Sequence, residues 1–157
     1  MLRHSASGPP GSPGTPSSSG APASLIPMVH IADPRVRWSV AAARVVRIVP
    51  ASEWRGPLVD VLVGLGELPA STSSRRVVVV RGADDRDIAV LAAGAIDIAE
   101  VDPSDVLELP DTFAAIAPQI YGIVVASNRS LSLLLQTSAV LPPDDRVLDE
   151  ELCPSRS

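Results

Sequence analysis

The stretch that decides the fold is RRVVVVRGADDRDIAVLAAGAIDIAEVDPSDVLELP, residues 75–110. It opens with four valines at 77–80, and a β-branched run of this kind predicts a strand covered on both faces. Residues 82–85, Gly-Ala-Asp-Asp, suit a tight turn, and the apolar run 88–91 follows, so the two runs predict a hairpin. A third run around residues 96–98 alternates apolar and polar side chains. The stretch therefore predicts a β meander.

Two further hairpins flank this stretch. The first is expected from strands at 25–31 and 36–40 around a turn at 32–35, and the second from strands at 120–126 and 131–135 around a turn at 127–130. Short helical turns are expected between strands, at residues 41–48, 58–66 and 111–117. Three hairpins with short helical connectors and no βαβ alternation predict a mainly β fold built from small closed or nearly closed barrels.

The 157 residues suffice for one compact domain. Residues 1–24 are dominated by Gly, Pro and Ser and predict a disordered leader, whereas 142–157 predict a flexible charged tail. The folded domain is therefore expected over residues 25–141.

Composition limits the partners and the compartment. The net charge is −5 and the arginines are scattered, so no nucleic acid contact is predicted. Cys153 is the one cysteine, which excludes an intramolecular disulfide. No apolar run is long enough for a membrane span or a signal peptide, so we expect a protein that does not contact membranes and stays in the cytoplasm.

No set of residues predicts catalysis, a metal site or a cofactor. His4 and His30 lack neighbours at metal-ligand or catalytic-triad spacing, and His30 is expected to find a backbone partner within a strand. Gly64-Leu65-Gly66 lacks the rest of a dinucleotide fingerprint and is better explained as a helix C-cap. The sequence has two clusters of aspartates: the first is Asp84, Asp85 and Asp87, and the second is Asp102 and Asp105. Both clusters are attributed to turns and helix capping.

The order of the motifs resembles the CheW-like family of chemotaxis coupling proteins. The resemblance covers residues 25–141 and rests on the segments AAARVVRI at 41–48, PLVDVL at 57–62, RVVVV at 76–80, IAVL at 88–91, EVDPSDV at 100–106, YGIV at 121–124 and LLL at 133–135. It implies a CheW-like fold of two intertwined SH3-like five-stranded barrels. It also implies a non-enzymatic adaptor that bridges the cytoplasmic tips of chemoreceptors to a CheA-type histidine kinase, with another CheW as a further partner.

Departures from the family pattern make this a divergent member, of the kind found as the second CheW-like protein of a Frz-type gliding-motility system. Between 41–48 and Arg55-Gly56 the family has about fifteen to twenty more residues, so one barrel should be trimmed. The family's valine-x-glutamate segment falls on residues 45–47, with Val45 in the valine position and Arg47 in the glutamate position. The arginine that pairs with that glutamate in the family falls on Arg55, so the resemblance implies a like-charge contact in place of an ion pair. Two family aspartates fall on Ala93 and Gln136. The resemblance thus implies partner binding through Val45, Arg47, Arg55 and Gly56, with kinase binding reduced or absent.

Two alternatives remain open. One keeps the fold but makes the chain a kinase-facing module that competes with a standard CheW. The other, from a different class, is a small enzyme with an unrecognised site. Receptor docking is expected to use an apolar groove between the barrels.

Overall fold

The computed structural model describes residues 8, 11, 14, 24–71 and 75–140. The strands are β1 Ile26–Ala32, β2 Trp38–Ala41, β3 Val45–Pro50, β4 Arg75–Arg81, β5 Asp87–Ala93, β6 Ala95–Val101, β7 Val106–Glu108, β8 Ile120–Val125 and β9 Leu131–Leu135. One short α-helix, α1 Asp111–Ala114, and six 3₁₀ turns connect them: η1 Ala42–Arg44, η2 Ala51–Glu53, η3 Val63–Leu65, η4 Ala83–Asp85, η5 Pro103–Asp105 and η6 Thr137–Ala139. The described chain is therefore mainly β.

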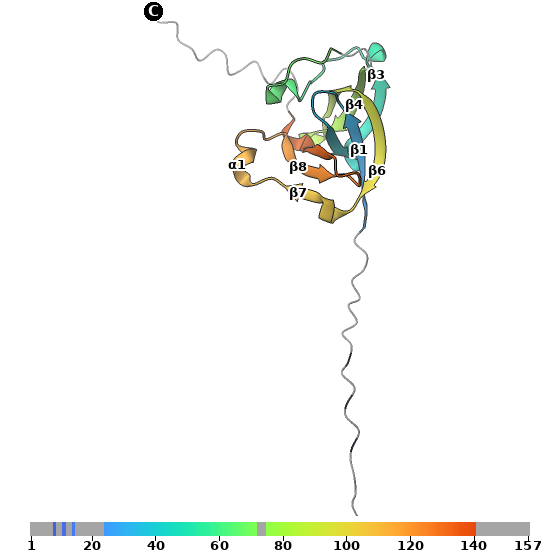
Figure 1. The fold of residues 1–157 in the computed structure, drawn as a ribbon. Helices are drawn as coiled ribbons and strands as arrows, with labels where there is room; N and C mark the ends of the chain where they lie inside the picture. Colours follow the sequence, from blue (N-terminus) through green and yellow to red (C-terminus); the bar gives the residue numbers. More distant parts are fainter. Residues whose placement is uncertain (1–7, 9–10, 12–13, 15–23, 72–74, 141–157) are drawn as a thin grey trace, which may run out of the picture.

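Six strands form one sheet in the order β6-β1-β2-β9-β8-β7 (Figure 1). All neighbours in it are antiparallel except β2 and β9, which pair in parallel. The two edge strands are consecutive in the chain, because β6 ends at Val101 and β7 begins at Val106 after the η5 turn. The Asp102 side chain caps this turn by accepting from the backbone N–H of Ser104 at 2.9 Å. The turn therefore brings the two edges of the sheet together at one corner, so the sheet curls toward a closed barrel.

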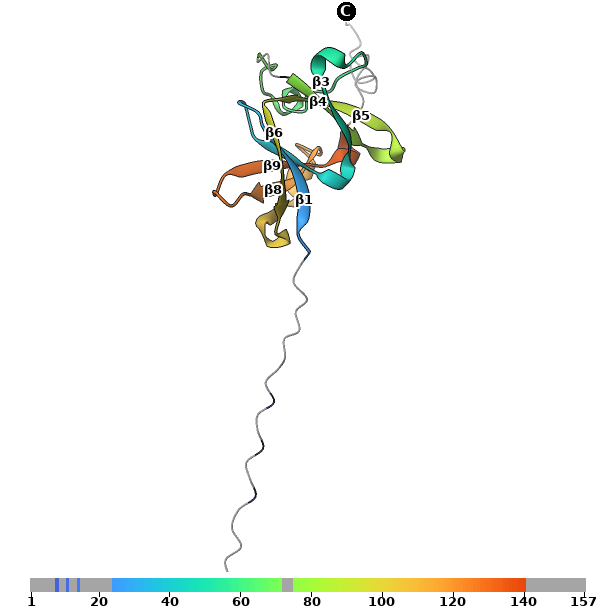
Figure 2. The same cartoon turned by 90° about the vertical axis from the view of Figure 1, so that its right-hand side faces the viewer.

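The other three strands form a smaller antiparallel sheet in the order β3-β4-β5, which lies beside β1 and β6 (Figure 2). Its central strand carries the four valines, and Val77, Val78, Val79 and Val80 are at most 2% exposed. Val78 and Val80 pack into the core shared with the large sheet, whereas Val77 and Val79 pack against Val49, Ala51 and Trp54. The prediction of a strand covered on both faces is confirmed.

The main core fills the space between the two sheets. Its largest fully buried side chain is Trp38, which packs with Ile31 and Val40 of the large sheet and with Val90 of the small one. The segment before η3 also contributes Leu62, and Val59 forms a parallel bridge with Val90 of β5. One apolar core thus joins both sheets into a single unit.

An ion-pair cluster that was not predicted from the sequence connects the β1–β2 loop to the segment after β3. The Arg35 guanidinium donates to Asp33 at 2.8 and 2.9 Å and to Asp60 at 2.7 Å. It also donates to the Leu68 carbonyl at 3.0 Å. The Asp33 side chain is fully buried, and these bonds to both carboxylates hold the pKa of Arg35 above its usual value. Arg35 therefore stays charged in the fold.

The predicted meander is wrong at its third strand. β4 and β5 form the expected hairpin, but β6 leaves the small sheet and pairs with β1 of the large one. The change of sheet takes place at Gly94, the single residue between β5 and β6, whose φ is +144°. Glycine adopts this conformation without the strain that a side chain would add. A single glycine therefore lets the chain pass from the small sheet to the large one.

The expected helical turns are shorter than predicted. Within residues 41–48 the only helical turn is η1, because β3 begins directly after it at Val45. Residues 58–66 hold the bridge at Val59 and then η3, and Gly66 ends η3 in the left-handed conformation, as predicted for a C-cap. Residues 111–117 contain α1, whose N-cap is Pro110 and which has no side-chain cap hydrogen bond. At residues 45–48 and at Val59, pairing with neighbouring strands outweighs helix propensity.

Most of the predicted leader, residues 1–24, and all of the predicted tail, 142–157, lie outside the described residues, together with His4 and Cys153. The folded part of the predicted domain is described over residues 24–71 and 75–140. Within this part, no helix is long and apolar enough to cross a membrane.

Candidate functional site

The four residues expected to bind partners lie on β3 and just after it. Val45 begins β3 and Arg47 lies in its middle, whereas Arg55 and Gly56 follow the η2 turn. β3 is an edge of the small sheet and pairs with β4 along one side. Arg47, Arg55 and Gly56 are exposed, and Val45 is partly buried. We call this region, β3 with residues 54–56, the β3 edge surface.

Trp54 brings two of these positions together. The Arg47 guanidinium carbon lies 5.5 Å from the centre of the Trp54 ring, which is a cation–π contact. The backbone of Gly56 packs against the same ring, since a Cβ at this position would lie 3.1 Å from it. The indole N–H donates to the Pro57 carbonyl at 3.2 Å, which fixes the orientation of the ring. Trp54 is therefore the organising side chain of the surface, and the sequence interpretation missed it.

Arg55 has a contact of its own. Its guanidinium donates to the Ser52 carbonyl at 3.1 Å. Arg47 stacks on Trp54, so each arginine has a partner other than a carboxylate. The surface thus carries two cations where the resemblance implies an acid–base pair.

Val45 belongs to a different environment. It is partly buried and packs against the main core between the sheets, and the neighbouring Val46 is 44% exposed. The strand pairing is irregular between Val45 and Arg47, where one residue is bulged. Val45 therefore connects the β3 edge surface to the junction of the two sheets.

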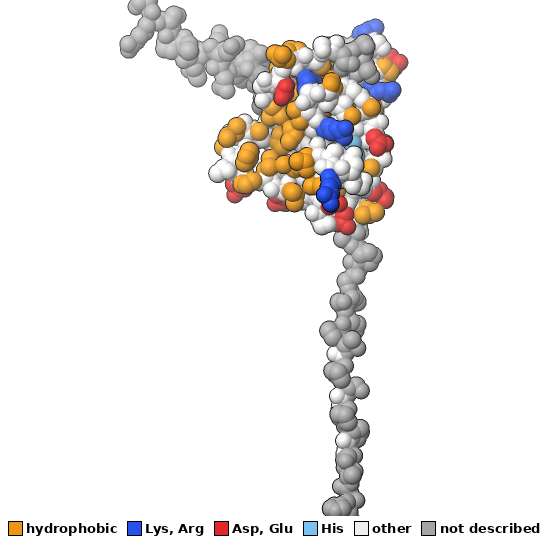
Figure 3. All heavy atoms as spheres, viewed as in Figure 1, with side chains coloured by type: hydrophobic (Ala, Val, Ile, Leu, Met, Phe, Trp, Pro, Cys, Tyr) orange, Lys and Arg blue, Asp and Glu red, His pale blue; other side chains and the backbone are white. Residues whose placement is uncertain are grey.

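A separate exposed region, which is apolar, lies over β7, α1 and β8 (Figure 3). Its large exposed side chains are Leu107, Phe113, Ile116 and Tyr121, and Ile116 is 82% exposed. Tyr121 hydrogen-bonds to Glu108, which raises the pKa of the phenol. Contiguous exposed apolar side chains of this kind mark surfaces that bind other proteins. The sequence interpretation missed this region because it did not predict β7.

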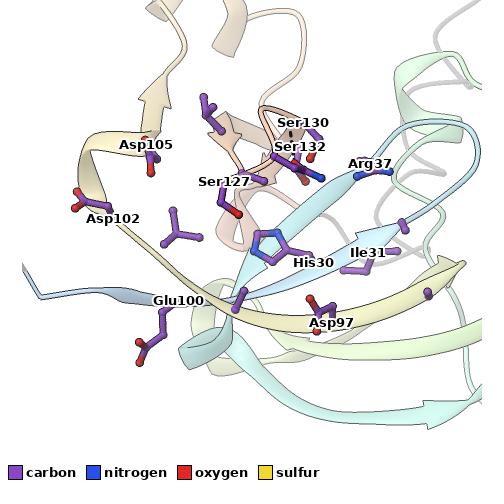
Figure 4. A pocket seen from close by; sticks show the side chains of 17 residues that line it. His30, Ile31, Arg37, Asp97, Glu100, Asp102, Asp105, Ser127, Ser130 and Ser132 are labelled. Atoms are coloured by element: carbon purple, nitrogen blue, oxygen red, sulfur yellow. Dashed lines mark hydrogen bonds between the residues drawn. The ribbon is translucent and has the colours of Figure 1, made fainter.

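Ser39, His30 and Asp97 lie in register on three neighbouring strands of the large sheet, and Figure 4 shows the last two. His30 Nδ1 lies 2.7 Å from Ser39 Oγ, and Asp97 pairs with His30 across the neighbouring strand. Ser39 is fully buried, however, and its hydroxyl also hydrogen-bonds to Ser132 at 2.6 Å. A buried hydroxyl with two partners cannot reach a substrate, so this row is not a nucleophile–base pair. His30 finds a side-chain partner, and the predicted backbone partner was wrong.

The protonation of His30 makes a testable prediction. Burial lowers its pKa below the usual value, partly opposed by the charge of Asp97. The unfolded chain binds this proton at about pH 6.5, whereas the folded chain binds it only at lower pH. The free energy of unfolding should therefore fall as the pH drops below about 6.5. Urea unfolding at about pH 7.5 and about pH 5.5 measures this loss, which should be smaller in His30→Gln. An equal loss in the variant would assign the effect to other groups.

Within residues 24–71 and 75–140, no cluster of three or more His, Cys, Asp or Glu side chains is placed to hold a metal ion. Asp84 and Asp85 sit at positive φ in the β4–β5 turn, and Asp87 forms an exposed ion pair with Arg81 at 2.9 Å. These contacts agree with the turn role predicted for the three aspartates.

Comparisons with known proteins identify the architecture. No protein-family model matches the sequence, and a search of curated proteins finds no match. Among solved structures, the scaffolding protein CheW from Thermoanaerobacter tengcongensis is similar, with a TM-score of 0.59 and 10% sequence identity. The similarity covers 73% of this chain and 86% of that chain. The chain has a CheW-like fold.

This confirms the predicted fold class. The large sheet has six strands and the small sheet has three. Only η2 and five more residues separate β3 from the Val59 bridge, so the connection after β3 contains no further strand. The predicted site residues thus lie at the border of the small sheet of a CheW-like fold.

Proposed function

We propose that this protein is a non-enzymatic adaptor of a bacterial chemosensory array. It docks in the cytoplasm on the tips of chemoreceptors and modulates their coupling to a CheA-type histidine kinase, with kinase binding reduced or absent. In the finer assignment, it is the second CheW-like protein of a Frz-type gliding-motility system.

The observation that carries this proposal is a CheW-like fold in which the small sheet is reduced to three strands. The fold supports an adaptor role. The short connection after β3 leaves that strand at the edge of the sheet, where the resemblance implies a further strand. Loss of that strand removes surface from one barrel, which supports the loss of one of the two partners.

The surface chemistry also supports an adaptor. The β3 edge surface presents Arg47 and Arg55, and the region over β7 and α1 exposes large apolar side chains. By contrast, the serine beside His30 is fully buried. The described residues therefore offer contact surfaces, and the hydroxyl that hydrogen-bonds to the His30 ring is not accessible.

The test is binding to the two isolated partners. The purified full chain is offered separately to an immobilised chemoreceptor cytoplasmic hairpin and to an immobilised CheA regulatory domain. We expect retention on the receptor and at least about tenfold weaker binding to the kinase domain. Tenfold corresponds to a loss of about 1.4 kcal/mol of binding free energy, which the loss of one set of contacts would exceed. Retention on the kinase domain alone would contradict the proposal and favour a module that competes with a standard CheW.

Two variants locate the interface. Val45→Asp places a charge beside the core junction, and Arg55→Asp reverses a surface charge without disturbing the core. Each should weaken receptor binding at least about tenfold, as expected for central interface positions. The matched controls are Val63→Asp, at an exposed valine of η3, and Arg129→Asp, at the β8–β9 turn. If the controls weaken binding as much as the test variants, the β3 edge surface is not the interface.

A further inference from the structure

A hollow opens on the inner face of the large sheet, outside the β3 edge surface. Its volume is about 410 Å³, within the usual range for small-molecule sites. β6 and β1 line one side of it, and β9 with the β8–β9 turn lines the other (Figure 4). The curled sheet thus encloses a space large enough for a compact organic molecule.

The hollow exists because the side chains that point into it are small. On β6 the lining residues include Ala95, Asp97 and Ala99, and across the hollow lie Ala126, Ser127 and Ser132. The apolar cluster of Met28, Val101, Val124 and Leu134 fills only one end of the curled sheet. The other end is therefore left open.

Two polar groups, one of them exposed, meet on the β1–β6 side of the hollow. Asp97 on β6 lies directly across from His30 on β1, and its carboxylate has no hydrogen bond or ion pair with any described residue. His30 Nδ1 is engaged by Ser39 Oγ at 2.7 Å. In the tautomer in which Nδ1–H donates to Ser39, Nε2 is an acceptor without a partner among the described residues. The β1–β6 side thus offers two adjacent acceptors.

The surrounding charge is predominantly negative. Asp102 and Asp105 stand at the η5 corner, at the other end of the hollow from Asp97, whereas Glu100 points to the far side of β6 (Figure 4). Arg37 is the one cationic side chain among the lining residues. Three carboxylates against one guanidinium favour a cationic occupant over an anionic one.

We propose that this hollow binds a small organic amine, with its ammonium group donating to the Asp97 carboxylate and to His30 Nε2. The apolar body of the amine packs on Ala99, Val101 and Val125, which line the same space. The Ser39–Ser132 hydrogen bond at 2.6 Å holds His30 through its other nitrogen, so the acceptor is positioned before the amine arrives. This site goes beyond the adaptor role and does not depend on it.

The probes are n-butylamine and benzylamine, with butyrate and n-butanol as matched compounds that lack the positive charge. Each is titrated into the isotopically labelled full chain, and binding is followed by amide chemical-shift changes. We expect saturable shifts at residues lining the hollow with the amines alone. The variant Asp97→Asn should weaken amine binding at least about tenfold, because it removes a charge-assisted hydrogen bond.

The control variant is Asp84→Asn, which removes the same charge at the β4–β5 turn, where asparagine tolerates the positive φ of 56°. It should bind amines like the unaltered chain. The proposal is overturned if the amines cause no saturable shifts, if the shifts lie away from the hollow, if butyrate or butanol binds equally well, or if Asp97→Asn binds amines unchanged. The receptor-binding assay gives a separate readout, so the two proposals can fail independently.

Discussion

Replacing Asp33 with alanine is expected to lower the free energy of unfolding by about 3–5 kcal/mol, the cost of breaking a buried ion pair from one side. The Asp33 carboxylate is fully buried and accepts three hydrogen bonds from Arg35, two from its guanidinium and one from its backbone N–H at 3.0 Å. Alanine would leave the guanidinium, itself only 11% exposed, with Asp60 as its one carboxylate partner. This loss is a large fraction of the total stability, since the free energy of unfolding of typical domains is about 5–15 kcal/mol.

Urea unfolding at neutral pH measures this loss. The control is Asp87→Ala, which breaks the exposed pair with Arg81 and should cost less than about 1 kcal/mol. The Asp33 variant should also loosen the segment around Asp60, because Arg35 connects the two loops, and faster amide exchange at Leu62 would report this. If the two aspartate variants cost the same, the cluster does not stabilise the fold as its geometry implies.

Local features of this chain could be predicted from its sequence, and long-range ones could not. The three hairpins and the buried valines of β4 follow from apolar runs and the turn residues between them. The parallel pairing of β2 with β9 joins segments more than ninety residues apart, and no local signal encodes it. The strand β7 was missed because its three residues are too few for a recognisable alternation.

The candidate site was predicted only in part. The resemblance selected Val45, Arg47, Arg55 and Gly56, and the structure places Arg47 and Gly56 against Trp54. The role of Trp54 depends on how η2 and Trp54 pack against Val77 and Val79 of β4, which the sequence pattern does not specify. The His30–Ser39–Ser132 chain was missed for a similar reason, because it needs the registers of two strand pairs. Side chains that meet through tertiary contacts leave no periodic signal.

Replacing Gly94 with alanine is expected to cost about 2–6 kcal/mol, the sum of backbone strain and steric overlap. Gly94 has a φ of +144°, and a Cβ there would collide with the Ala32 carbonyl group of the strand beside it. Backbone atoms cannot move aside as a flexible side chain can. Relief would require β6 to shift along β1, and a shift of one residue would turn Asp97 away from the hollow.

Gly66→Ala is the matched control for this substitution. Gly66 also has positive φ, at 93°, but a Cβ there would meet no atom within 4 Å, so this variant reports the backbone strain alone. The difference between the two losses in unfolding free energy measures the overlap at Gly94. Equal losses would show that the close approach to Ala32 is relaxed in solution. A larger loss at Gly94, together with weaker amine binding, would show that this one residue sets both the crossover between sheets and the shape of the hollow.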